Sequence, residues 1–147
     1  MKVEDAFLAI LKKTSWQCTT DSASLYNGVC IELERYPLHF QTFTGNELVV
    51  KCDVCSLPDE VYERNDLLKL AGKKVAMVWI DHQIYMTTFK KFIRLELRLN
   101  TDQLKSDQVI EKVQIFLDDC DSFQDLLSDE RTKFSSIPPF GGMGLML

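Results

Sequence analysis

The fold is decided by residues 29–54, which read VCIELERYPLHFQTFTGNELVVKCDV. Apolar and polar side chains alternate in three successive runs, at residues 29–34, 38–43 and 48–54. Pro37 separates the first two runs, and Thr44-Gly45-Asn46 is a turn sequence before the third. Period-two alternation indicates strands with one buried face, and short connections favour antiparallel neighbours. The stretch therefore predicts a three-stranded antiparallel meander.

Helical periodicity flanks this meander at both ends of the chain. An amphipathic helix that ends near Thr14 is predicted from apolar residues spaced three and four apart: Val3, Ala6, Phe7, Ile10 and Leu11. A long helix with an acidic outer face is predicted from near Ser106 to about Leu127. The segment after Glu130 has no period, so residues 131–147 are expected to form a flexible C-terminal tail.

The middle of the chain is predicted to contain a second helix followed by strands. Asp59 is a plausible cap for a helix that runs to about Leu70, and Gly72 stands where a C-terminal cap is expected. Strands are then predicted at 74–80, 84–89 and 92–99. The whole sequence predicts an α+β domain over residues 1–130, with three helices covering an antiparallel sheet of five to six strands in the order α-β-β-β-α-β-β-α.

Composition and charge narrow the class of protein. The longest apolar run, residues 75–80, is far shorter than the roughly 20 residues of a membrane helix, and the first residues lack a signal-peptide pattern. We therefore expect the protein to stay in the compartment where it is made.

The net charge of −5 disfavours nucleic-acid binding. Residues 69–98 carry seven basic and two acidic side chains, whereas residues 101–130 carry two basic and nine acidic ones. Opposite charges in two segments suit self-association or binding of a protein partner, but they equally describe two solvated faces.

The five cysteines do not form a recognisable metal or redox site. Cys52 and Cys55 match a C-x-x-C pattern, but no second such pair exists, and His39 and His82 stand apart. The pair ends a predicted strand, where side chains three apart point to opposite faces, so the sulfurs are not expected to meet. An odd cysteine number without an export signal indicates a reducing compartment and structural thiols. Nucleophile, zinc and phosphate-loop motifs are absent, so we expect no enzyme, no metal and no cofactor.

The predicted order of elements resembles that of the class I type III secretion chaperones, over roughly residues 3–128. The resemblance depends on the size and acidic pI, the opening helix Ala6–Leu11, the meander, the Leu57-Pro58 junction before the leucines at 67 and 68, and a hairpin that leads into a long acidic helix. It implies a non-enzymatic homodimer in the cytoplasm of a Gram-negative bacterium. Such a protein holds the disordered N-terminal chaperone-binding segment of one or more effectors extended, soluble and competent for secretion.

The same resemblance implies partners and surfaces. The partners are a second copy of the chain, secreted effector proteins and the ATPase of the secretion apparatus, with no nucleic acid and no membrane insertion. The implied dimer interface comprises Leu67, Leu68, Val75, Met77, Val78 and Trp79. The implied effector-binding residues are Leu8, Trp16, Leu38, Phe40, Phe43 and Val49.

Alternatives to these assignments stay open at the level of sequence. The run at 75–80 is apolar on both faces, as an interface strand would be, but a strand between two layers of its own domain would look the same. Each effector-binding candidate can also be an ordinary core residue. The rival function is a dimeric α+β adaptor or regulator that binds a folded protein partner.

Overall fold

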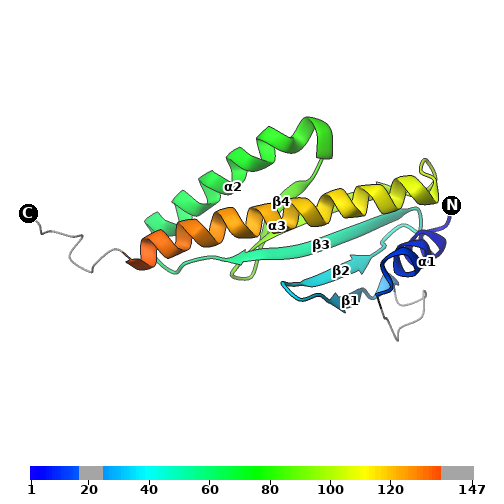
Figure 1. The fold of residues 1–147 in the computed structure, drawn as a ribbon, viewed down its shortest axis with the longest axis horizontal. Helices are drawn as coiled ribbons and strands as arrows, with labels where there is room; N and C mark the ends of the chain where they lie inside the picture. The colour runs from blue at the N-terminus through cyan, green and yellow to red at the C-terminus, as the bar shows by residue number, and fades with distance from the viewer. Residues whose placement is uncertain (17–24, 137–147) are drawn as a thin grey trace, which may run out of the picture.

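The computed structural model describes residues 1–16 and 25–136 of the chain (Figure 1). The predicted α+β class and the order α-β-β-β-α-β-β-α are confirmed. The elements are α1 (Val3–Thr14), β1 (Val29–Glu32), β2 (Pro37–Gln41), β3 (Glu47–Ser56), α2 (Val61–His82), β4 (Tyr85–Phe89), β5 (Phe92–Asn100) and α3 (Ser106–Ser136).

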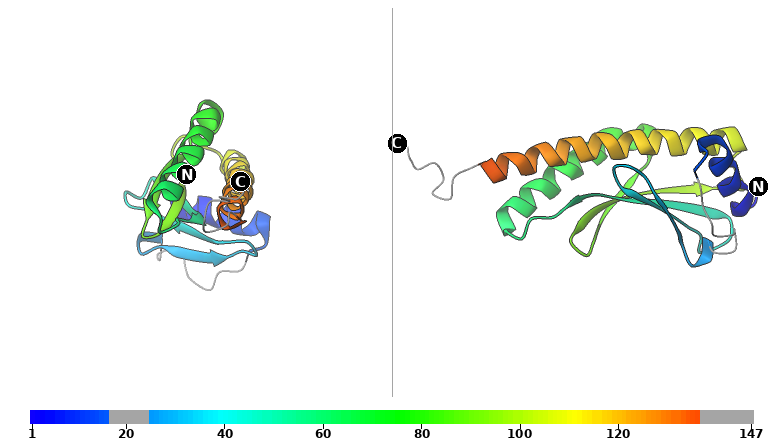
Figure 2. Two further views of the ribbon diagram at one scale, coloured as in Figure 1. Left: turned by 90° about the vertical axis from the view of Figure 1, so that its left-hand side faces the viewer. Right: turned by 60° about the horizontal axis from the view of Figure 1, so that its bottom comes forward.

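The five strands form one antiparallel sheet in the order β1-β2-β3-β5-β4. The predicted meander is confirmed as β1, β2 and β3, and the long strands β3 and β5 pair at the centre. Figure 2 shows α1 and α3 on one face of this sheet, with α2 beside α3. The opposite face, which we call the outer face, is not covered by any element of the described residues.

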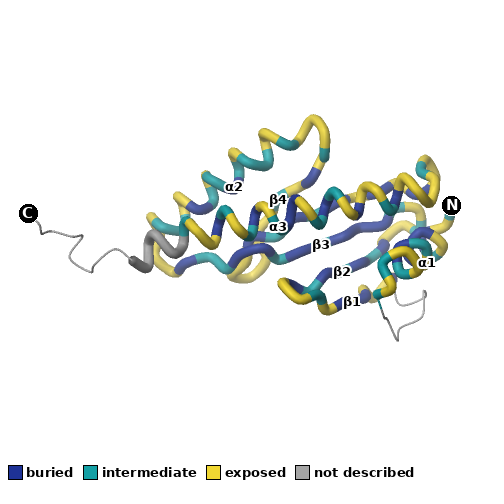
Figure 3. Tube along the Cα trace, in the orientation of Figure 1, coloured by how far each residue is buried: buried dark blue, intermediate teal, exposed yellow. Residues whose placement is uncertain are grey.

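The core lies between the sheet and α1 and α3, as the alternation predicts. Val50 of β3 and Leu97 of β5 are paired and point inward, and both are buried. Phe7 of α1 packs against Phe40 of β2 with ring centroids 5.1 Å apart. The face of α3 that meets the sheet repeats at helical spacing, with Val109, Val113, Phe116, Cys120, Phe123 and Leu127 buried. Figure 3 shows that β3 is buried along most of its length.

The predicted strand at 74–80 is wrong, because α2 continues through it to His82. Gly72 does not end the helix: it lies inside α2, where a glycine costs only about 1 kcal/mol, and no neighbouring atom lies within 4 Å of the position of a Cβ. Val75 and Val78, three residues apart, pack against the core on the same side of the helix. The helix ends at His82 and is capped by Gln83, whose left-handed φ of 52° lets its N–H reach the Trp79 carbonyl at 2.9 Å.

The other helix boundaries differ by smaller amounts. The cap of α2 is Glu60 rather than Asp59, and its carboxylate accepts hydrogen bonds from the N–H groups of Tyr62 and Glu63. These bonds hold the pKa of Glu60 below its usual value. The long helix starts at Ser106 as predicted but extends beyond Leu127 to Ser136, so the start of the expected tail is helical. Residues 137–147 of that tail lie outside the described residues.

The C-x-x-C segment also differs from the prediction. The β3–β5 register shifts between Asp53 and Cys55, so the strand is not regular there and both Cys52 and Cys55 are buried. The Cys52 thiol lies in the core against Cys120 of α3, and burial raises the pKa of Cys120. A raised pKa suppresses the thiolate, which agrees with a structural rather than a reactive thiol.

Candidate functional site

Within the described residues, no three His, Cys, Asp or Glu side chains are grouped so that they could hold a metal ion. His39 lies half-buried on the outer face, and burial together with Arg94 lowers its pKa. His82 is 2.7 Å from Asp119 and fastens the end of α2 to α3. None of the helices described in residues 1–16 and 25–136 is long and apolar enough to cross a membrane. The candidate binding features of residues 1–16 and 25–136 include exposed apolar side chains, open sheet edges and a pocket beside α3.

Several large apolar side chains are exposed at the end of α2 and on β4. Met77 and Ile80 are 81% and 86% exposed, which is unusual for side chains of this kind. Trp79 joins this helix to β4 through an edge-to-face contact with Tyr85, with centroids 5.1 Å apart. Phe89, at the other end of β4, is 41% exposed. We call these five residues the α2–β4 surface.

Two cations stack on the aromatic rings of β4. The Arg98 guanidinium lies 4.6 Å from the Tyr85 ring centroid, and the Arg94 guanidinium lies 3.9 Å from that of Phe89. Arg94 also makes two hydrogen bonds to Asp53, at 2.7 and 3.2 Å, on the outer face. The stacking holds the rings in fixed positions, so this side of the sheet presents ordered aromatic groups to solvent.

The residues expected at a dimer interface fall into two groups. Met77 and Trp79 lie on the α2–β4 surface. Leu68, Val75 and Val78 are partly buried and pack against the core, and Leu67 is completely buried, so it has no surface to offer a partner. The sequence reasoning did not select Ile80, Tyr85 or Phe89. Ile80 joins Met77 only because α2 continues through residues 74–80, which places residues 77 and 80 on one side of the helix.

The residues expected to bind an effector are also divided. Leu38 and Phe40 are completely buried under the helices, and Val49 is 2% exposed, so these three present no surface in this structure. Trp16 is half-buried with its ring 6.5 Å from that of Phe40. Leu8 and Phe43 are 52% and 61% exposed. Only these last two offer a large apolar contact area.

Phe43 belongs to a small surface at the turn between β2 and β3. The ammonium group of Lys51 lies 5.3 Å from the Phe43 ring centroid. Tyr26 is 52% exposed, and its hydroxyl lies at the same turn, 2.8 Å from the position of a Cβ on Gly45. Gly45 has a φ of 85°, which favours glycine at this turn. The absence of a Cβ also leaves room for the Tyr26 hydroxyl. We call Tyr26 and Phe43 the β2–β3 turn surface.

The sheet has an open edge on each side. β1 pairs only with β2, and β4 pairs only with β5, among the strands of the described residues. The backbone N–H and C=O groups on the outer sides of these strands have no ladder partner within that part of the chain. Such edges can accept a further strand from another polypeptide.

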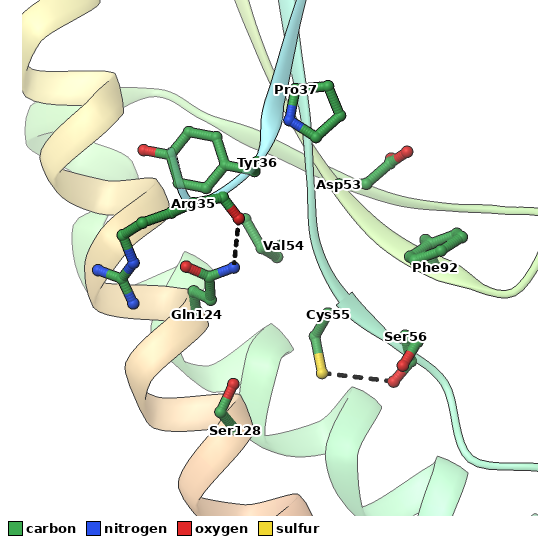
Figure 4. Close-up of a pocket in the computed structure, with 10 residues that line it drawn as sticks. All are labelled: Arg35, Tyr36, Pro37, Asp53, Val54, Cys55, Ser56, Phe92, Gln124 and Ser128. Carbon is green, nitrogen blue, oxygen red and sulfur yellow. Dashed lines mark hydrogen bonds between the residues drawn. The ribbon is translucent and has the colours of Figure 1, made fainter. Parts of the chain in front are cut away.

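A pocket of about 450 Å³ opens between the β1–β2 turn, β3, the start of β5 and α3 (Figure 4). The Gln124 side chain of α3 donates a hydrogen bond to the Arg35 carbonyl at 3.3 Å and so ties the turn to the helix. The Tyr36 hydroxyl donates to Asp121 at 2.9 Å, and burial with this bond raises the pKa of Tyr36. The lining residues are Arg35, Tyr36, Pro37, Asp53, Val54, Cys55, Ser56, Phe92, Gln124 and Ser128.

Comparison with known proteins places this fold. No family model and no curated protein sequence matches the chain. Among solved structures, the chain is similar to the Yersinia pestis type III secretion chaperone SycH in complex with a stable fragment of YscM2, at 12% identity and a TM-score of 0.56, covering 82% of this chain and 98% of that one. It is similar to the ExsC–ExsE complex at 12% identity and a TM-score of 0.60, covering 86% and 97%.

A third similar structure is the HopA1–SchA chaperone–effector complex, at 9% identity and a TM-score of 0.56, covering 79% of this chain and 88% of that one. The overlap includes nearly the whole of each known chain, so the likeness concerns the complete fold and not one motif. The predicted resemblance is confirmed at the level of structure: this chain has the fold of the type III secretion chaperones.

Proposed function

We propose that the protein is a homodimeric type III secretion chaperone of the bacterial cytoplasm. It binds the disordered N-terminal segment of one or more effector proteins and keeps that segment extended, soluble and competent for secretion. The observation that carries the proposal is the fold shared with proteins solved in chaperone complexes, on a chain that also has exposed apolar surfaces and open sheet edges. Binding of this kind requires no chemistry and no cofactor.

The α2–β4 surface is the proposed site for a second copy of the chain. Met77 and Ile80 expose almost all of their apolar side chains, and a soluble protein rarely leaves such a patch uncovered. The surface combines one helix face with one edge strand, so two copies related by a two-fold axis can cover both features at once. Dimers most often form through such self-complementary contacts.

The opposite side of the molecule is the proposed site for the guest polypeptide. An extended segment can pair with the open edge of β1, while its alternate side chains contact apolar groups nearby. The β2–β3 turn surface and Leu8 supply exposed apolar groups on this half of the chain. A disordered guest loses conformational entropy when it becomes ordered, so many modest contacts must be distributed along it.

The proposal is tested with a guest obtained from the native host. Proteins that copurify with the chain are identified by mass spectrometry, and the first hundred or so residues of each candidate are then co-expressed with it. We expect a soluble complex with a guest segment that is unstructured when alone. A guest segment that is already folded when alone would instead support the adaptor function.

Phe43→Asp provides the residue-level test of the guest site. Phe43 is 61% exposed and lies near Lys51, so an aspartate there should not disturb the fold. Loss of one central aromatic contact should weaken guest binding by about tenfold or more. The matched control is Tyr62→Asp, which changes an aromatic residue that is 79% exposed in the first turn of α2. Equal guest affinity for both variants would remove the β2–β3 turn surface from the binding site.

A further inference from the structure

The pocket beside α3 contains no unpaired charge on its charged lining residues. The Arg35 guanidinium pairs with Asp121 and Asp125 of α3. The Asp53 carboxylate pairs with Arg94, and both side chains are largely buried, at 17% and 12% exposure. An acidic or basic occupant would therefore meet charges that are already neutralised. The rest of the wall has an apolar side formed by Tyr36, Pro37, Val54 and Phe92. The pocket thus favours an occupant without charge, which can contact this apolar side.

The chain itself contains such a segment. Residues 137–147 read IPPFGGMGLML and include no charged side chain. Pro138 and Pro139 follow the end of α3 at Ser136 almost directly. A residue before proline disfavours the helical conformation, so the sequence predicts that the chain leaves the helix axis at Ile137. Phe140 is the first large aromatic group after that point.

The distances allow Phe140 to reach the pocket. Ser128 lines the pocket, and eight residues of helix separate it from Ser136, which is about 12 Å at 1.5 Å per residue. Phe140 is four residues beyond Ser136, which spans about 12 Å in the extended conformation that proline pairs favour. The segment therefore needs only to turn back along α3. The pocket volume of about 450 Å³ lies within the range of sites that hold small apolar ligands.

We propose that residues 138–140 of the chain's own C-terminal segment dock in this pocket, with the Phe140 ring against Phe92. The docked ring would cover Phe92, which is otherwise 40% exposed, and pair with it as aromatic side chains do in cores. The contact is intramolecular and does not depend on the proposed chaperone function. It makes the pocket self-occupied, so any polypeptide that uses the same pocket must first displace Phe140.

The test replaces Phe140 by the photo-reactive residue p-benzoylphenylalanine in the full-length chain. After irradiation, mass spectrometry should find most adducts on peptides that contain residues 35–37, 53–56 and 92. Adding Phe92→Ala should lower the yield of pocket adducts by about fivefold. Tyr62→Ala is the matched control, because Tyr62 is 79% exposed in the first turn of α2 and does not line the pocket, and it should leave the yield unchanged.

Isotope labelling separates docking within one chain from docking between chains. Equal amounts of ¹⁵N-labelled and unlabelled protein are mixed before irradiation, and we expect adducts within one isotope type only. Three results would overturn the proposal: adducts scattered along α3 without preference for the pocket peptides, adducts mainly between labelled and unlabelled chains, or equal yields with Phe92→Ala and Tyr62→Ala.

Discussion

Ile80→Asp should convert the dimer into a folded monomer. Ile80 is 86% exposed in the single chain, so the substitution removes almost no packing within it, and the monomer should unfold within about 0.5 kcal/mol of the parent. In the dimer, covering an isoleucine contributes about 1.5–3 kcal/mol, and the two-fold axis doubles this to roughly 3–6 kcal/mol. Loss of this free energy alone should raise the dissociation constant of the dimer by about a hundredfold or more. Burial of an unpaired carboxylate should raise it further.

Light scattering with size-exclusion chromatography measures this directly. The parent should elute as a dimer of about 34 kDa, twice the chain mass of 17.0 kDa, and the variant as a monomer at micromolar concentration. Leu8→Asp is the matched control, because Leu8 is 52% exposed on α1, away from the α2–β4 surface, and should leave the dimer intact. A parent that is monomeric, or an Ile80→Asp variant that stays dimeric with normal stability, would refute the reasoning.

Three further predictions concern the core and the titrating groups. Phe7→Ala should lower the free energy of unfolding by about 3–5 kcal/mol in urea titrations, because the ring is 1% exposed and its removal leaves a cavity; a loss below 1 kcal/mol would contradict the packing described. Burial raises the pKa of Asp119, so parent stability should fall as the pH rises above the usual aspartate pKa, and Asp119→Asn should gain stability relative to the parent over the same rise; a stability difference that does not change with pH would contradict this. A thiol reagent should label exposed Cys30 in the native protein but Cys120 only after unfolding; equal labelling rates would place Cys120 outside the core.

The strands could be predicted because each carries its own signal. The alternation in residues 29–54 indicates which side chains share the inward face of the sheet. Leu38, Phe40 and Val50, which this pattern places on one face, are completely buried. The bulge between Asp53 and Cys55 could not be read from that alternation, because it depends on the register with β5.

The second half of α2 could not be predicted from local pattern alone. A six-residue apolar run is compatible with a buried strand or with a helix segment, and Gly72 before it favoured a break. What determines the helix is the packing of Val75 and Val78 on the core, a contact between segments that are distant in sequence. The α2–β4 surface became visible only when the run proved helical, because that places Met77 and Ile80 on the exposed side.

The guest surface illustrates the same limit. In this alternating run Leu38 and Phe40 share one face and Phe43 falls on the other, but the alternation alone does not say which face the helices cover. In the structure β2 ends at Gln41, so Phe43 lies beyond the strand and faces solvent, whereas the first two lie beneath the helices. The face of the sheet that the helices cover, which depends on packing between distant segments, thus decides which aromatic group can meet a partner.

Hydrogen exchange of a guest segment, free and bound to the chain, tests the central claim most directly. An unstructured guest held in extended form should exchange fully when free and gain protection only in separate short stretches when bound, while the open edge of β1 gains protection in the same complex. A guest that is protected along its whole length before binding, or a complex in which β1 exchanges as fast as in the free protein, would contradict the account.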